Sequence, residues 1–226
     1  MTKSNIEIWE DVFQKKEWGK YPSIPVIKFI ARHFYSAQKR QQIKILEIGS
    51  GTGANLWFCA REGFTVYGIE GSKTAINRMD KRFLEENLSL MIGEIIEGDF
   101  LNKLDEYPNN YFDAIIDSEA LYCNSFDKTK DIVKKSFEKL KYGGVMLSIT
   151  FADGCWGMND DECDYHTIVP KVGPLSGVGT VRYTTRADVD NLYKLETNVI
   201  EKIERQEYFL TETNVIKEWV IELRKV

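Results

Sequence analysis

Three glycines at alternate positions follow a short apolar run in the segment Lys44-Ile-Leu-Glu-Ile-Gly-Ser-Gly-Thr-Gly-Ala54. The apolar run predicts a buried strand, and the pattern after it predicts a helix. Glycines at such a turn permit positive φ angles and let the backbone approach a ligand closely. The start of the helix offers free N–H groups and a partial positive charge to an anion. That anion could be a pyrophosphate or an amino-acid carboxylate, because Gly49-x-Gly51-x-x-Ala54 also satisfies the dinucleotide fingerprint.

Acidic residues stand at the ends of the next predicted strands. Glu70 ends the second strand, and Asp99, with Phe100 behind it, ends the third. An acid at the first of these places can take both hydroxyls of a ribose, and an acid followed by an aromatic suits the edge and face of an adenine. The fourth strand ends in Asp117-Ser118, beside the first strand, where the sheet order reverses and ligands usually bind.

Alternating apolar runs and amphipathic stretches predict the elements that position these residues. Five strands are expected at 43–48, 65–69, 90–97, 112–117 and 144–151. Helices between them are expected at 54–61, 72–86 and 127–140. Such alternation implies a parallel sheet with helices on both faces.

The two ends of the chain depart from this alternation. Residues 1–42 predict two helical pieces that form an N-terminal cap over the cofactor pocket, and 152–183 an irregular insert. A short helix at 185–192 precedes two strands, 195–204 and 214–224, which should pair as an antiparallel hairpin. The fold prediction is α/β: a doubly wound, mostly parallel seven-stranded sheet with a C-terminal hairpin, in a single domain over 1–226.

The full set of motifs resembles the class I, Rossmann-like S-adenosylmethionine-dependent methyltransferases. The glycine loop, the acid after strand two, Gly98-Asp99-Phe100 and Lys141-Tyr-Gly-Gly144 occur in that family's order. The resemblance covers residues 43–151, and the terminal hairpin agrees with the family's last two strands. The segment Trp18-Gly-Lys-Tyr-Pro22 resembles the N-terminal region of bacterial small-molecule members.

The resemblance implies S-adenosylmethionine as cofactor and S-adenosylhomocysteine as its product. Glu47 would support the loop, and Asp117 and Ser118 would supply backbone groups near the methionine amine. The loop residues expected to face the methionine portion are Gly49, Ser50, Gly51 and Gly53.

The same resemblance implies a set of contacts to the nucleoside. Glu70 would bind the ribose diol, and Gly71 and Ser72 would line the adenine. Asp99 would accept from the adenine amino group, with Phe100 beside the ring. Glu70 stands where many members have Asp, and its longer arm should still reach the diol.

Four further side chains are candidates for contact with cofactor or acceptor. Trp18 and Tyr21 could close over the cofactor, with an aromatic face near the sulfonium, or could be core residues of the cap. Tyr122 has the same two alternatives: it could line the substrate pocket, or it could be a core residue. His166 is the candidate general base for an acceptor near neutral pH, the alternative being a histidine on a surface loop.

Composition limits the partners and the compartment. The formal charge is −5 over 226 residues with both signs interspersed, so no nucleic-acid partner is expected. The N-terminus lacks a signal-peptide pattern and no apolar stretch could cross a bilayer, which predicts a cytoplasmic protein without a membrane partner. Four sparse cysteines predict a reduced protein, and Cys155, Cys163 and His166 match no compact zinc pattern, so no metal is expected.

The expected activity is methyl transfer to an oxygen or nitrogen of a small-molecule acceptor by direct in-line displacement. The acceptor site is expected to be walled by residues 1–40 and 152–183. Alternatives are a protein or peptide methyltransferase, an NAD-dependent dehydrogenase that shares the loop and Glu70, and a non-catalytic cofactor-binding module. The sequence carries no signal for an oligomeric state.

Overall fold

The computed structural model describes residues 3–226, and seven strands form its main sheet in the order β3-β2-β1-β4-β5-β9-β8. The first five strands along the chain are parallel to one another, as expected. The C-terminal hairpin places β9 antiparallel between β5 and β8. The bounds of these strands are β1 Lys44–Ile48, β2 Thr65–Glu70, β3 Ile92–Glu97, β4 Phe112–Ser118, β5 Leu140–Phe151, β8 Asn198–Phe209 and β9 Val215–Lys225.

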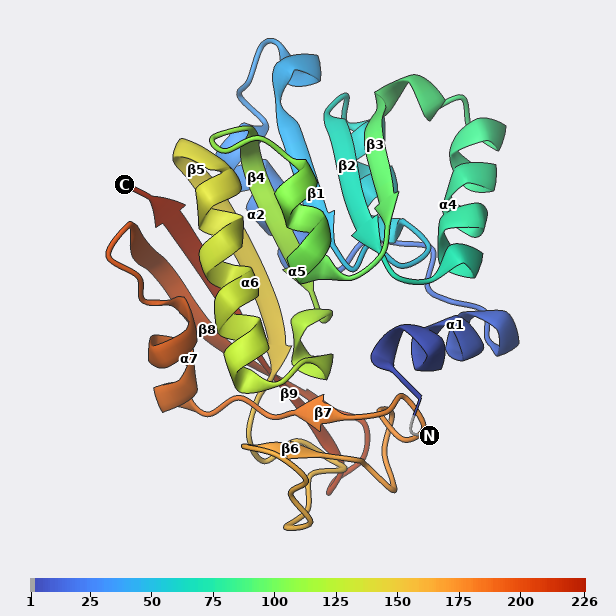
Figure 1. Ribbon diagram of the computed structural model, residues 1–226, viewed down its shortest axis with the longest axis vertical. Coiled ribbons are helices and arrows are strands. Elements are labelled where there is room, and N and C mark those ends of the chain that lie inside the picture. The colour runs from blue at the N-terminus through green and yellow to red at the C-terminus, as the bar shows by residue number, and fades with distance from the viewer. Residues whose placement is uncertain (1–2) are drawn as a thin grey trace.

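Helices cover both faces of this sheet (Figure 1). The α-helices are α1 Asn5–Lys15, α2 Ile24–Phe34, α3 Ala54–Arg61, α4 Lys73–Glu85, α5 Phe100–Lys103, α6 Phe126–Lys139 and α7 Arg186–Tyr193. Short 3₁₀ turns are η1 Arg40–Gln42, η2 Ser89–Met91, η3 Leu104–Glu106 and η4 Leu121–Cys123. The doubly wound α/β fold predicted from the sequence is therefore confirmed.

Strand alternation divides the core between the two faces. Leu46 and Ile48 of β1 join one cluster with Phe137 of α6 and Leu192 of α7. Ile45 joins a second cluster with α2, α3 and α4. Because successive side chains of a strand point to opposite faces, one buried five-residue strand serves both layers.

The two N-terminal helices have different roles. Helix α2 packs Val26, Phe29 and Ile30 fully buried into the second core cluster, so it covers the sheet. Helix α1 lies beyond the carboxyl ends of the parallel strands and forms the cap (Figure 1). It begins at a capping box, in which Ser4 and Glu7 satisfy each other's backbone N–H groups.

The insert contains a small sheet and joins the cap. Two-residue strands β6 (Thr167–Ile168) and β7 (Val181–Arg182) pair antiparallel. Their Ile168 and Val181 belong to a third apolar cluster together with Val12 of α1. Figure 1 shows α1 and this insert at the same end of the molecule. None of the helices in the described part of the chain is both long and apolar enough to span a membrane.

Several element bounds differ from the sequence expectation. Strand β5 starts at Leu140 instead of 144, because Leu140 pairs with Phe112 before the register shifts at the glycines. Strand β3 starts at Ile92 because η2 takes the preceding residues. Helix α5 was not expected, since four residues carry no measurable period.

Candidate functional site

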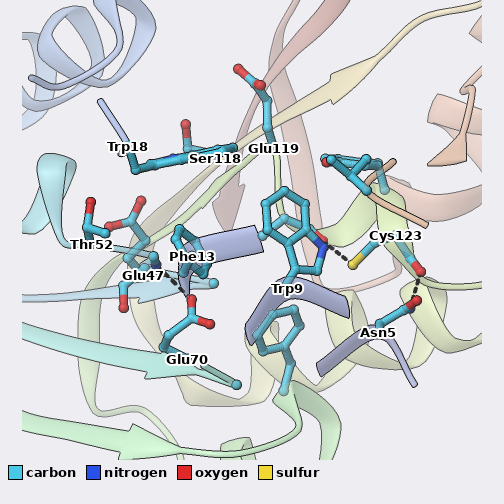
Figure 2. Close-up of a pocket in the computed structure, with 18 of the residues that line it drawn as sticks. Asn5, Trp9, Phe13, Trp18, Glu47, Thr52, Glu70, Ser118, Glu119 and Cys123 are labelled. Atoms are coloured by element: carbon cyan, nitrogen blue, oxygen red, sulfur yellow. Dashed lines mark hydrogen bonds between the residues drawn. The ribbon is translucent and has the colours of Figure 1, made fainter. Parts of the chain in front are cut away.

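A cavity of about 290 Å³ opens at the carboxyl ends of the central strands. The glycine loop and the ends of β2 and β4 form its floor, and α1 and the insert form the opposite wall. In Figure 2, Glu47, Thr52 and Glu70 lie on one side of this pocket and Asn5 and Cys123 on the other. Ligands of open α/β sheets bind at this location, where β1 and β4 are neighbours and the strand order reverses.

The glycine loop adopts the backbone that its sequence predicts. Gly49, Gly51 and Gly53 have φ angles of 69°, 52° and 80°, which favour glycine over every other residue. A Cβ at Gly49 would lie 2.3 Å from the Cβ of Ala120, so the turn after β4 packs directly on the loop. Glycine is required at position 53 by another contact, because a Cβ there would lie 2.5 Å from the side chain of Met79 in α4.

Glu70 connects the end of β2 to the glycine loop. Its carboxylate accepts from the backbone N–H of Gly51 at 2.7 Å and of Ser72 at 2.8 Å. The side chain is buried yet lines the cavity. Burial raises the pKa of this carboxyl, and backbone N–H groups, among them those of Ser72 and Gly51, oppose the rise. Each carboxylate oxygen keeps a lone pair for a further donor.

Glu47 presents an unsatisfied carboxylate oxygen at the cavity. Asn55 of α3 donates to Glu47 Oε1 at 2.6 Å, and Asn55 in turn accepts from the N–H of Ser23. Glu47 Oε2 and Ser50 Oγ are buried and have no hydrogen-bond partner among the described residues. Burial, followed by the charges of nearby acids, raises the pKa of Glu47 to about 8. A buried carboxyl in this condition favours a cationic or hydrogen-bond-donating ligand.

Asp99 is held in place at the end of β3. One of its oxygens accepts from the N–H of Leu101, and the other accepts from Lys128 Nζ at 2.6 Å. Asp99, Phe100 and Lys128 all line the cavity. Lys128 comes from α6, 29 residues after Asp99, and nothing in the sequence pattern marks it as part of the site.

Asp117 is buried behind the cavity wall, unlike the neighbouring Ser118. Its carboxyl is fully buried and accepts from Ser148 Oγ at 2.5 Å and from the N–H groups of Ala120 and Leu121. The pKa of Asp117 is raised to about 6 by burial, against the effect of these hydrogen bonds. Ser118 lines the cavity and Asp117 does not. Asp117 therefore positions the turn 118–121 behind the wall of the pocket.

Aromatic residues close the pocket on the side of α1. Trp18 packs edge-on against Trp9 and Phe13, with ring centroids 5.6 Å and 5.3 Å apart. Tyr21 lines the cavity too, although it is 77% exposed. Tyr122 also lines the cavity and is buried, in the same apolar cluster as Val12 of α1. These three aromatic residues, all expected at the site, thus reach it.

His166 lies elsewhere. Its Nδ1 is 2.8 Å from a carboxylate oxygen of Asp188, and its ring stacks on Tyr165. The residues lining the cavity do not include His166, which instead ties the insert to the start of α7. From this position His166 does not serve as the expected general base, because a base must come within hydrogen-bond reach of the acceptor.

The structure brings together most of the residues expected at the site and adds others. Gly53, Ser72 and Asp117 lie behind the cavity wall, where they shape the loop, cap α4 and hold the turn after β4. Sequence reasoning missed several lining residues of α1, α3, α6 and the β4 turn, and it located those of the insert only as a segment. These residues are Asn5, Ile6, Trp9, Phe13, Asn55, Glu119, Lys128, Pro174, Leu175 and Val178.

The fold is that of a Rossmann-like α/β protein, and the cavity lies where such proteins bind their ligands. Residues 45–144 match the family model described as a methyltransferase domain. This segment contains the glycine loop, Glu70, Asp99 and the turn after β4. Residues 45–144, which make up less than half of the chain, are thus similar to a methyltransferase domain.

Known proteins similar to the chain include methyltransferases. Phosphoethanolamine N-methyltransferase of Plasmodium falciparum (isolate 3D7) is 23% identical over 147 residues, which cover 65% of this chain and 52% of that protein. The match therefore spans about half the length of this curated relative.

Two solved structures show the same fold with S-adenosylhomocysteine bound. Geranyl diphosphate C-methyltransferase from Streptomyces coelicolor A3(2), which also holds Mg²⁺ and geranyl diphosphate, has a TM-score of 0.68 at 13% identity over 100% of both chains. The 1,6-didemethyltoxoflavin N1-methyltransferase from Burkholderia thailandensis, with its substrate bound, has a TM-score of 0.65 at 13% identity over 90% of this chain and 77% of that chain.

Proposed function

We propose that this chain, as a single methyltransferase domain over residues 1–226, transfers a methyl group from S-adenosylmethionine to a nitrogen or oxygen atom of a small-molecule acceptor. The observation that carries the proposal is the cavity at the carboxyl ends of the strands. Glu47, Glu70 and Asp99 all line it, at the ends of three successive parallel strands. A cofactor with an amino-acid end, a ribose and an adenine needs polar groups in this order.

The residues present fit the parts of that cofactor. Glu47 Oε2 and Ser50 Oγ are buried without a partner, and we assign them to the methionine end together with the backbone of Gly49 and Gly51. A cationic ammonium group would satisfy the Glu47 oxygen. Ser118 adds backbone groups on the β4 side of the same end.

We assign the nucleoside to the other half of the cavity. Glu70 takes the ribose hydroxyls while its backbone bonds hold the carboxylate in place. Gly71 lies beside the adenine, where a Cβ would approach Ile6 to 2.9 Å. Asp99 accepts from the adenine amino group and keeps its bond to Lys128, and Phe100 packs beside the ring.

The remaining wall of the cavity supports a small acceptor. Residues of α1 and of the insert close it from two sides, with Trp9, Leu175 and Val178 among them. Trp18, Tyr21 and Tyr122 add aromatic surface around the reacting centre. The small substrates named for the relatives, phosphoethanolamine and 1,6-didemethyltoxoflavin, agree with a pocket of this size.

Catalysis in this pocket is mainly alignment. When bound, the cofactor would supply a methyl group on a positively charged sulfur. The acceptor atom would attack that methyl carbon in line, and the sulfur would leave as a neutral thioether. The chain contributes by fixing the acceptor at attack distance, excluding water and, where the acceptor must lose a proton, taking that proton. We also propose a cytoplasmic protein, on the ground that all four cysteines are free thiols in the structure.

Calorimetric titration combined with a transfer assay tests the proposal. S-adenosylmethionine and S-adenosylhomocysteine should bind, NADH should not, and S-adenosylhomocysteine should accumulate when a panel of small amines and alcohols is added. Tight binding of NADH alone would favour a dehydrogenase. Cofactor binding with transfer only to peptides or proteins would contradict the small-molecule acceptor.

A further inference from the structure

Two carboxyl groups that the cofactor does not explain meet at the wall of the cavity. Glu119 follows β4 directly, and its N–H donates to the carbonyl of Ile149 on β5 at 3.0 Å. Glu218 on β9 pairs in register with Phe151 of β5. These strands bring the two carboxyl groups close enough for each to affect the pKa of the other. Glu119 lines the cavity, while Glu218 lies behind it and is buried.

Glu119 is separate from the residues assigned to the cofactor. In Figure 2 its carboxyl lies apart from Glu47 and Glu70. Its backbone has a φ of 57°, a left-handed conformation that is uncommon for a residue with a Cβ. Such conformations persist where the surrounding structure holds them, often at functional sites.

No cation balances this pair. Among the ion pairs of residues 3–226, none involves Glu119 or Glu218. The titratable groups that face the pair are Asp117 of β4, Tyr122 of η4, Tyr208 of β8 and Cys155 of the insert. Each of these groups is neutral or anionic at neutral pH, so the wall lacks a positive charge that an acceptor could supply.

Burial first, and then the neighbouring Glu218, raises the pKa of Glu119 to about 8. The pKa of Glu218 is also raised, by burial. When two carboxyl groups lie close together, the negative charge of one disfavours ionisation of the other. With a pKa of about 8 the free Glu119 carboxyl holds its proton at pH 7, and a bound ammonium group beside it would favour the carboxylate.

We propose that Glu119, positioned by Glu218, binds the amino group of the acceptor and receives its proton, so that the substrate class of this site is a small amine. The inference rests on the proposed function. It selects nitrogen over oxygen as the atom methylated, and it replaces His166 with Glu119 as the group that handles the proton.

The proton and charge balance of the step is complete. The acceptor enters as an ammonium ion beside the Glu119 carboxylate, and one proton passes from its nitrogen to that carboxylate, which becomes a neutral carboxyl group. The freed nitrogen lone pair attacks the methyl carbon, so that an N–C bond forms as the C–S bond breaks. The product leaves as a methylated ammonium ion, and the sulfonium becomes a neutral thioether.

An alcohol is a poorer acceptor than an amine beside Glu119 and Glu218. A neutral hydroxyl supplies no positive charge to the pair. Its proton is also far more weakly acidic than that of an ammonium ion, so a carboxylate does not remove it in the ground state. Trp9 and Trp18, which line the same cavity, add aromatic faces that favour a cation.

The test compares amines with their matched alcohols. The probes are phosphoethanolamine and 2-hydroxyethyl phosphate, followed by other amine and alcohol pairs of equal size. Binding of each probe to the protein saturated with S-adenosylhomocysteine is measured by calorimetry, and methyl transfer is measured by mass spectrometry of the products. We expect binding and transfer with amines and little of either with the alcohols.

Variants separate recognition from folding. Glu119→Gln should lower kcat/KM for an amine by about 100-fold, the range expected for loss of a proton acceptor, with unchanged affinity for S-adenosylmethionine. Glu218→Gln should move the acidic limb of the pH profile to lower pH, because an amide donor stabilises the Glu119 carboxylate. Glu196→Gln, an exposed acid outside the cavity, serves as the control.

The outcomes distinguish the two proposals. A protein that does not bind S-adenosylmethionine overturns the proposed function. A protein that binds the cofactor but recognises alcohols as well as amines, or neither, overturns the inference alone. Full amine activity in a folded Glu119→Gln protein overturns it as well.

Discussion

The N–H of Gly51 donates to the carboxylate of Glu70 at 2.7 Å, which joins the glycine loop after β1 to the end of β2. The same carboxylate accepts from Ser72, the N-cap residue of α4. One buried acid thus fixes two turns and keeps lone pairs for a ligand. The loop and the acid that sequence analysis treated as separate motifs are one connected unit.

Removal of this acid should weaken the cofactor site. Glu70→Ala should reduce the affinity for S-adenosylmethionine by about 1.5–3 kcal/mol, through loss of charge-assisted hydrogen bonds to the ribose. Calorimetry on the folded variant measures the effect. Glu97→Ala changes an exposed acid at the end of the neighbouring strand and should leave the affinity unchanged. Equal affinities for Glu70→Ala and the wild type would remove the assigned role.

The contact between Gly49 and Ala120 makes a second prediction. Gly49→Ala adds a Cβ at a positive φ and against Ala120, so it should destabilise the protein by more than the ~1–2 kcal/mol of the conformation alone. Gly143→Ala, at a φ of 75° with open space around it, isolates the conformational part. Denaturant unfolding compares the two.

Addition of Ala120→Gly to Gly49→Ala relieves the contact but leaves the strained φ. The double variant should therefore recover part of the lost stability. An Ala120→Gly change that brings no recovery would mean that the packing of the β4 turn on the loop does not limit residue 49.

Glu10 attaches the cap to α4. Its carboxylate accepts from Ser72 Oγ at 2.5 Å and from the N–H and hydroxyl of Thr74 at 3.1 Å and 2.5 Å. These bonds outweigh the effect of desolvation and lower the pKa of Glu10 to about 2. The folded-state pKa is below the usual 4.5, so this stabilisation is present above about pH 4.5 and is lost as the pH falls towards 2.

Glu10→Ala should accordingly loosen α1 without unfolding the sheet. Hydrogen exchange of residues 5–15 should become faster, and cofactor affinity should fall because α1 walls the cavity. Glu212→Ala alters an exposed acid in the turn between β8 and β9 and should change neither quantity. Unchanged exchange in Glu10→Ala would show that other contacts hold the cap.

Glu47 predicts a proton linkage to cofactor binding. With a pKa of about 8 the free carboxyl is protonated at pH 7, and an ammonium group beside it would favour the carboxylate. Binding should therefore release a proton at pH 7, and affinity should rise between about pH 6 and 8. Calorimetry in buffers of different ionisation enthalpy measures the release, which Glu47→Gln should abolish. Heats independent of the buffer would contradict this.

His166 gives a prediction opposite to the one its residue type suggested. Because it bonds to Asp188 outside the cavity, His166→Ala should leave kcat for an amine acceptor unchanged and lower the stability of the insert. Steady-state kinetics and thermal unfolding test both parts. A large loss of kcat at constant stability would return His166 to the reaction.

Local patterns were sufficient to predict most of the fold. The loop Gly49–Gly53, Glu70 and Asp99 each follow a strand whose end is visible in the apolar pattern, so parallel pairing had to place them together. Lys128 and Glu119 could not be found in this way. Their roles arise from contacts with Asp99 and Glu218, which depend on helix packing and on β9 entering the sheet beside β5.

The insert is a second case in which the local sequence predicts a segment but not its individual lining residues. Its composition predicted an irregular wall near the site, and Leu175 and Val178 do line the cavity. The choice among its residues depends on how it packs on Val12 of α1, a contact between segments far apart in the sequence. His166 seemed the natural base by residue type, but that packing directs it to Asp188.

The most direct test of the central claim is calorimetric titration of the protein with S-adenosylmethionine and, in parallel, with NADH. The account predicts one S-adenosylmethionine bound per chain, weaker binding to Glu70→Ala, and no binding of NADH. Tight binding of NADH without binding of S-adenosylmethionine would contradict it.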